Sequence, residues 1–79
     1  MEEGFILSNK FRRAVFTEIV SGEHDILRIS KKHRIPLPIA QKTIRELTEA
    51  GVVKKEGNNQ YLLTREGEKV ADRIKSQKL

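Results

Sequence analysis

The sequence predicts a small α+β domain, mostly α, with three helices, a two-stranded β-hairpin and a C-terminal helix in that order. Apolar residues recur at helical spacing in three stretches before residue 51. Gly51 then stops the third helix, because glycine readily adopts the positive φ that such a stop requires. After it, two short apolar runs flank the turn-forming residues Gly57-Asn58-Asn59. The 79 residues are therefore expected to form one domain, 1–79.

The first helix is predicted to follow an N-terminal tail, residues 1–7, which ends in the apolar run Phe5-Ile6-Leu7. Ser8 or Asn9 can cap this helix, because a side-chain oxygen there accepts a hydrogen bond from an unpaired backbone N–H. Gly22 is expected to end it. Its apolar stripe consists of Phe11, Ala14, Val15, Phe16 and Ile19.

The second helix is short, and Asp25 can serve as its cap. Ser30 offers a small side chain where another helix can cross closely, and Arg34 and Ile35 lie in a tight turn before Pro36. The inner face of this helix is expected to comprise Ile26, Leu27 and Ile29.

The third helix is expected to start near Leu37 or Pro38 and to span 37–50, because proline suits the first helical position. Its buried stripe at spacing i, i+4, i+7 is Ala40, Ile44 and Leu47.

The hairpin is predicted over residues 52–64, with a loop of three to four residues. Thr64 is expected to cap the last helix, and residues 75–79 are expected to fray because they are polar and terminal. The apolar side of the last helix is Val70, Ala71 and Ile74.

The composition favours a polyanionic partner. Sixteen Lys and Arg oppose eleven Asp and Glu, which gives a net charge of +5. A basic small domain is attracted to nucleic acid or to anionic lipid surfaces, although 34% charged residues would also simply keep a small domain dispersed. The absence of cysteine excludes disulfides, and no apolar run approaches the ~20 residues of a membrane span. The expected location is the cytoplasm.

Three segments resemble winged helix-turn-helix regulators. "IRELTEAGVVKK" is similar to the Leu-x-x-Leu-x-x-x-Gly-apolar-apolar-basic pattern that ends their recognition helix. "YLLTREGEKVAD" resembles the Tyr-x-Leu-Thr-x-x-Gly-x-x-x-Ala segment that leaves the wing in MarR-like and ArsR-like repressors, and "ILRISKKHRIP" resembles their first helix-turn-helix helix. The resemblance spans roughly Ser8 to Ile74. It implies a transcriptional regulator that binds double-stranded DNA, commonly as a homodimer joined by its terminal helices.

Two positions depart from the pattern of this family. Arg34 stands in the turn where the family often has glycine. The third helix opens with "PLPIAQKT", where many DNA-reading members have serine and threonine hydroxyls. Its prolines donate no backbone N–H to phosphate, and Leu37 and Ile39 cannot hydrogen-bond a base edge.

The resemblance implies that the third helix enters the major groove while the hairpin lies on the DNA backbone or in the minor groove. Gln41 then suits adenine, Lys42 and Arg45 suit guanine or phosphate, and Ile39 suits a thymine methyl. Alternatively, Lys42 and Arg45 belong to a solvated face with Glu46 and Glu49 as partners, and the hairpin lysines discourage edge pairing. The expected DNA-binding residues are Lys31, Lys32, Pro38, Ile39, Gln41, Lys42, Arg45, Lys54, Lys55, Asn58 and Arg65.

Other functions have weaker support in the sequence. No spacing of Ser, His and acidic residues indicates a catalytic triad or a metal site, and His24 and His33 are expected to be surface or turn residues. No enzyme activity, cofactor or metal is expected. The rival hypothesis is a protein-interaction module that presents Leu37 and Ile39, since exposed apolar residues mark interaction sites. A third hypothesis is a protein that coats nucleic acid without sequence preference.

Overall fold

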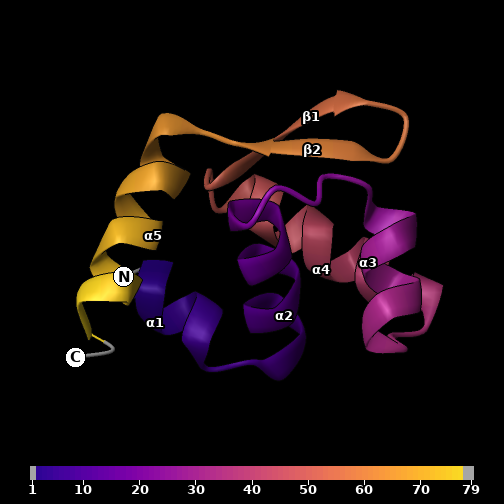
Figure 1. The fold of residues 1–79 in the computed structure, drawn as a ribbon, viewed down its shortest axis with the longest axis horizontal. Coiled ribbons are helices and arrows are strands. Elements are labelled where there is room, and N and C mark those ends of the chain that lie inside the picture. The colour runs from indigo at the N-terminus through magenta and orange to yellow at the C-terminus, as the bar shows by residue number, and fades with distance from the viewer. Residues whose placement is uncertain (1, 78–79) are drawn as a thin grey trace.

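The fold was analysed in a computed structural model, which describes residues 2–77. These residues form five α-helices and one two-stranded antiparallel sheet (Figure 1). The predicted α+β, mostly α class is confirmed, but four helices precede the hairpin where three were expected. The elements are α1 (Glu2–Leu7), α2 (Lys10–Val20), α3 (Ile26–His33), α4 (Leu37–Glu49), β1 (Val53–Gly57), β2 (Gln60–Leu63) and α5 (Arg65–Gln77).

The extra helix, α1, lies where the sequence predicted a tail. Six residues are too few for a stable isolated helix, so contacts with other elements must stabilise it. Ile6 is buried in the core, and Glu3 accepts a hydrogen bond of 2.8 Å from Nε of Arg73 on α5. The guanidinium of Arg12 on α2 lies 3.9 Å from the centre of the Phe5 ring, a cation–π contact. Glu3 and Arg73 are 70 positions apart in the sequence, whereas Phe5 and Arg12 are seven apart.

The helix ends follow the local signals closely. Asn9 and Asp25 accept hydrogen bonds from the first backbone N–H groups of α2 and α3, and Thr64 Oγ1 accepts one from Gly67 N–H in α5. Gly22 and Gly51 adopt positive φ after α2 and α4, as predicted. Residues 75–77, where fraying was expected, belong to α5, and residues 78–79 lie outside the described part.

The hairpin is tighter than predicted. Val53 pairs with Leu63 and Gly57 with Gln60, which leaves a loop of two residues, Asn58 and Asn59, and a register shift at Glu56. Asn59 has a φ of 62°, which asparagine tolerates well. Val52, expected to begin the first strand, precedes it.

The segment before α3 holds the free edge of β2. The backbone N–H of Tyr61 donates to the carbonyl of His24 at 3.0 Å, and that of Ile26 donates to the carbonyl of Asn59 at 2.9 Å. These two bonds satisfy groups that an exposed strand edge would otherwise leave unpaired. The hairpin is therefore fixed to the segment between α2 and α3 as well as to α4 and α5.

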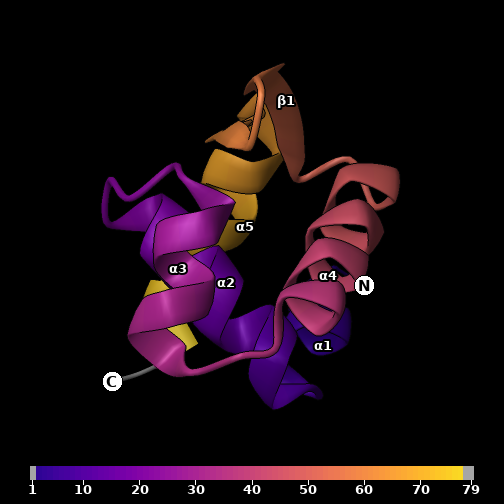
Figure 2. The same ribbon diagram turned by 90° about the vertical axis from the view of Figure 1, so that its right-hand side faces the viewer.

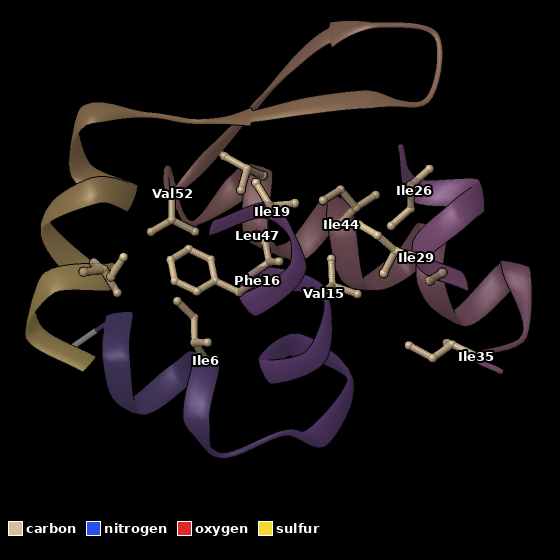
Figure 3. Packing of buried hydrophobic residues seen from close by; sticks show 14 residues of the cluster. Ile6, Val15, Phe16, Ile19, Ile26, Ile29, Ile35, Ile44, Leu47 and Val52 are labelled. Carbon is tan, nitrogen blue, oxygen red and sulfur yellow. The ribbon is translucent and has the colours of Figure 1, made fainter. Parts of the chain in front are cut away.

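The core lies between the helices and beneath the hairpin (Figure 3). The predicted inner residues Ala40, Ile44 and Leu47 of α4 are buried. On α3 the prediction for Leu27 is wrong, since it is 38% exposed. The inward positions of α3 are Ile26, Ile29 and Ser30, at spacing i, i+3, i+4, and Leu27 lies outside this stripe. No helix in residues 2–77 is long and apolar enough to cross a membrane.

Candidate nucleic-acid interface

The candidate interface centres on α4 and on the turn that precedes it. Pro36 occupies the N-cap position and Pro38 lies in the first turn, where the missing N–H of proline costs no helical hydrogen bond. The buried side of α4 also includes Thr43, whose hydroxyl donates to the carbonyl of Ile39 at 2.8 Å. Burial of this side leaves the opposite side of α4 on the surface.

All of the predicted DNA-binding residues are exposed in the structure. The exposed set comprises Lys31, Lys32, Pro38, Ile39, Gln41, Lys42, Arg45, Lys54, Lys55, Asn58 and Arg65. Exposure of this kind leaves a basic side chain available to a polyanion, although it does not by itself identify one.

The fold brings parts of the elements that carry these residues to one end of the molecule. In Figure 1 the tip of the hairpin is at the upper right, beside the start of α3, and the C-terminal end of α3 and the N-terminal end of α4 are at the lower right. Arg65 begins α5, at the opposite end of the hairpin from its tip. Arg65 is therefore separated from the N-terminal end of α4.

The exposed cations of α4 have no carboxylate partner in the described part of the chain. Within residues 2–77, neither Lys42 nor Arg45 forms an ion pair with a carboxylate. Glu46 instead accepts a hydrogen bond of 3.1 Å from Nε of Arg12 on α2. Glu49 lines an open hollow of about 520 Å³ together with Glu2, Phe5, Glu46 and Ala50. The charge on α4 thus changes from positive to negative toward its C-terminus, which favours a polyanion on the N-terminal half.

The two hairpin lysines project from opposite faces of the strand. Side chains alternate along a strand, so Lys54 shares a face with its partner Leu62, and Lys55 shares the other face with Tyr61. Tyr61 packs against the core, so the face that carries Tyr61 and Lys55 is the one turned toward the body of the molecule. Lys54 projects from the outer face. The two side chains therefore leave the hairpin on opposite sides.

Of the predicted DNA-binding residues, Lys32 forms an ion pair within the described part of the chain. Its Nζ lies 3.1 Å from Oε2 of Glu18 on α2, and His33 Nε2 lies 2.7 Å from the same oxygen. The Glu18 side chain is only 12% exposed. The hydrogen bond from His33, followed by that from Lys32, lowers the pKa of Glu18 below its ordinary value.

The lowered pKa of Glu18 predicts a loss of stability in acid that a glutamine substitution removes. The stabilising contribution of this carboxylate is complete above its unfolded pKa of about 4.3 and is lost as the pH falls through the lower folded pKa. On the order of 0.5–1 kcal/mol is expected to depend on this ionisation. Urea unfolding at pH 7 and pH 3 should therefore show a smaller acid loss for Glu18→Gln than for the wild type.

Glu68→Gln is the matched control for this titration, because Glu68 is exposed and forms no ion pair within residues 2–77. It should retain the acid loss of the wild type. Equal acid losses in Glu18→Gln and Glu68→Gln would contradict the assigned role of Glu18.

Exposed apolar residues accompany the cations at the start of α4. Leu37 is 38% exposed and Ile39 is 36% exposed.

Within residues 2–77, no group of three His, Cys, Asp or Glu side chains is placed to hold a metal ion.

Apolar residues of the two terminal helices, through which the resemblance implies a homodimer, pack within the chain. Ile6 of α1 and Val70 and Ala71 of α5 are buried, and the two helices are joined by the Glu3–Arg73 ion pair. A smaller apolar hollow of about 190 Å³ remains between α1, α2 and α5. The homodimer stays a prediction that rests on the family resemblance.

Comparisons with protein-family models, with curated proteins and with solved structures find no match to this chain.

Proposed function

We propose that the protein binds duplex DNA as a winged helix-turn-helix domain, with α4 as the recognition helix and the β1–β2 hairpin as the wing. The observation that carries the proposal is the set of exposed cations without carboxylate partners on α4 and β1, Lys42, Arg45, Lys54 and Lys55, within residues 2–77. The hairpin tip and the N-terminal end of α4 both lie on the right-hand side in Figure 1, the tip above and the start of the helix below.

In this arrangement the N-terminal half of α4 lies in the major groove. Gln41 hydrogen-bonds adenine, Ile39 contacts a thymine methyl, and Lys42 and Arg45 bind guanine or phosphate. The hairpin lysines bind phosphates on the backbone or beside the minor groove, which positions the domain without reading sequence. Because Arg65 lies at the far end of the hairpin, it contributes less than the other predicted contacts.

The resemblance supports a role as a dimeric transcriptional regulator, and the composition supports a cytoplasmic location. Two copies would place their recognition helices one DNA turn apart and favour a palindromic site.

A salt series tests the proposal. Fluorescence anisotropy on a random-sequence duplex should show affinity that falls steeply with salt, because binding releases counterions from the phosphates. Lys42→Ala/Arg45→Ala and Lys54→Ala/Lys55→Ala should each reduce the slope of log K against log salt by about one to two. Lys69→Ala/Lys75→Ala removes the same charge from α5 and is the matched control, which should leave the slope close to that of the wild type.

If all three double variants reduce the slope by the same amount, only the net charge of the protein matters for binding. The protein would then coat nucleic acid without a defined interface. Absent or shallow binding by the wild type would contradict DNA binding altogether.

A protein-interaction module is the second candidate, and the exposure of Leu37 and Ile39 favours it. It predicts weak DNA affinity that none of the four cation substitutions changes. This candidate would be supported if a protein partner binds the wild type but not Leu37→Ser/Ile39→Ser, while both proteins bind DNA with the same affinity.

A further inference from the structure

The turn between α3 and α4 holds a long cationic side chain in a backbone conformation that suits glycine. Arg34 has φ 53° and ψ 40°, in the left-handed region, directly after the last residue of α3. For residues with a Cβ this region is strained, and only asparagine, aspartate and glycine enter it readily. Among residues 2–77, the other non-glycine residue with positive φ is Asn59, which belongs to this tolerant group.

The neighbours of Arg34, and not its own side chain, impose this conformation. Its backbone N–H donates to the carbonyl of Lys31 at 3.3 Å, and the N–H of Ile35 donates to that of Ser30 at 2.9 Å. The Ser30 hydroxyl in turn donates to the carbonyl of Ile35 at 2.6 Å. Ile35 is buried, which anchors the far side of the turn. This is the hydrogen-bonded helix end that usually carries glycine.

Nothing in the described part of the chain uses the Arg34 side chain. It is exposed, and within residues 2–77 its guanidinium forms neither a hydrogen bond nor an ion pair. By contrast, Arg12 binds Glu46 and Arg73 binds Glu3. Folding therefore supplies no reason for an arginine where glycine would be less strained.

The position of the turn supplies a reason outside the chain. The turn lies at the end of the molecule that also carries the start of α4 and the tip of the hairpin (Figure 2). Lys31, three residues earlier, is likewise exposed and has no ion-pair partner within residues 2–77. Both cations are therefore exposed on the segment that directly precedes α4.

We propose that Arg34 is a phosphate-binding residue of the DNA interface, presented by the rigid turn beside the groove that α4 occupies. The inference rests on the proposed function. A guanidinium binds a phosphate through two parallel hydrogen bonds, and a fixed backbone directs it toward one phosphate. The strain at Arg34 is then retained for binding, as happens where function and stability compete.

Arg34→Gly separates binding from stability, because the substitution should raise stability and lower DNA affinity. The urea midpoint should rise by a few tenths molar as the strain is relieved. The affinity for a random-sequence duplex should fall about fivefold, and the salt slope should decrease by about one. Arg34→Lys keeps both the charge and the backbone strain, so it should retain the slope and the urea midpoint while losing part of the affinity.

Lys69→Ala is the charge-matched control, since Lys69 is exposed on α5 and forms no ion pair within residues 2–77. If Arg34→Gly and Lys69→Ala bind alike while Lys42→Ala/Arg45→Ala flattens the salt slope, the role of Arg34 is overturned and DNA binding stands. If the wild type itself shows no salt-dependent binding, the proposed function fails first and this inference fails with it. A lower urea midpoint for Arg34→Gly would overturn the claim of strain.

Discussion

Gly67→Ala is expected to destabilise the protein by about 3 kcal/mol or more, a large part of the stability of a small domain. A Cβ on Gly67 would overlap the backbone carbonyl oxygen of Val52. That oxygen cannot simply move aside, because it accepts a hydrogen bond of 3.1 Å from the N–H of Thr64. The Thr64 hydroxyl also donates to the carbonyl of Gly51 at 2.6 Å. The methyl group would therefore separate α5 from the start of the hairpin, and urea unfolding followed by circular dichroism measures the loss.

Gly4→Ala is the matched control. Gly4 also lies in a helix, but a Cβ there would have no neighbour within 4 Å. Alanine stabilises a helix by up to about 1 kcal/mol relative to glycine, so this variant should be as stable as the wild type or more stable. The same substitution should thus have opposite signs at the two sites. A Gly67→Ala variant as stable as Gly4→Ala would refute the close approach of α5 to Val52.

Leu47→Ala is expected to cost about 3 kcal/mol, through the loss of buried apolar surface and the cavity left behind. Leu47 is fully buried on the inner side of α4 and belongs to the core shown in Figure 3. The packing of α4 against the rest of the chain depends on this side, so loss of DNA binding in this variant would report unfolding. Thermal or urea unfolding measures the change.

Leu37→Ala provides the comparison on the same helix. Leu37 is 38% exposed, and its truncation should change the free energy of unfolding by no more than about 0.5 kcal/mol. A large effect at Leu37, or a small one at Leu47, would mean that α4 presents a different face to the core. Leu37→Ala therefore also suits binding experiments, because the fold should tolerate it.

The local features of the fold were predictable because each depends on a few adjacent residues. Asn9, Asp25 and Thr64 cap helices because their side-chain oxygens reach N–H groups two or three residues ahead. Gly51 stops α4 because it adopts φ 83°. The buried stripe of α4 follows from the helical period alone.

Contacts between distant segments were not predictable in the same way. The tail prediction was wrong for residues 2–7 because α1 is stabilised by α2 and α5, through pairs such as Glu3 and Arg73 that lie 70 residues apart. Glu46 lies one residue from Arg45, yet it binds Arg12, which lies 34 residues away. Helix periodicity does not reveal which neighbouring element will reach a given exposed carboxylate.

The candidate interface shows the same division. The sequence identified cations that prove to be exposed, but it could not show which of Lys54 and Lys55 faces the body of the molecule or that Arg65 lies away from the start of α4. It also placed Arg34 at a glycine position without counting it among the contacts. The arginine at a glycine position was visible in the sequence. Its role could be inferred only from the φ of 53° and from the absence of a partner for the Arg34 side chain within residues 2–77.

The sequence by itself determined the order of the elements from α2 onward, their caps and stops, and the buried side of α4, because these follow from backbone geometry and helical periodicity. Only the tertiary structure decided that α1 is a helix, that Gly67 permits α5 to approach Val52, and which charges remain available at one end of the molecule. Those outcomes depend on distances between segments that are remote in the sequence, and packing of the whole chain sets these distances.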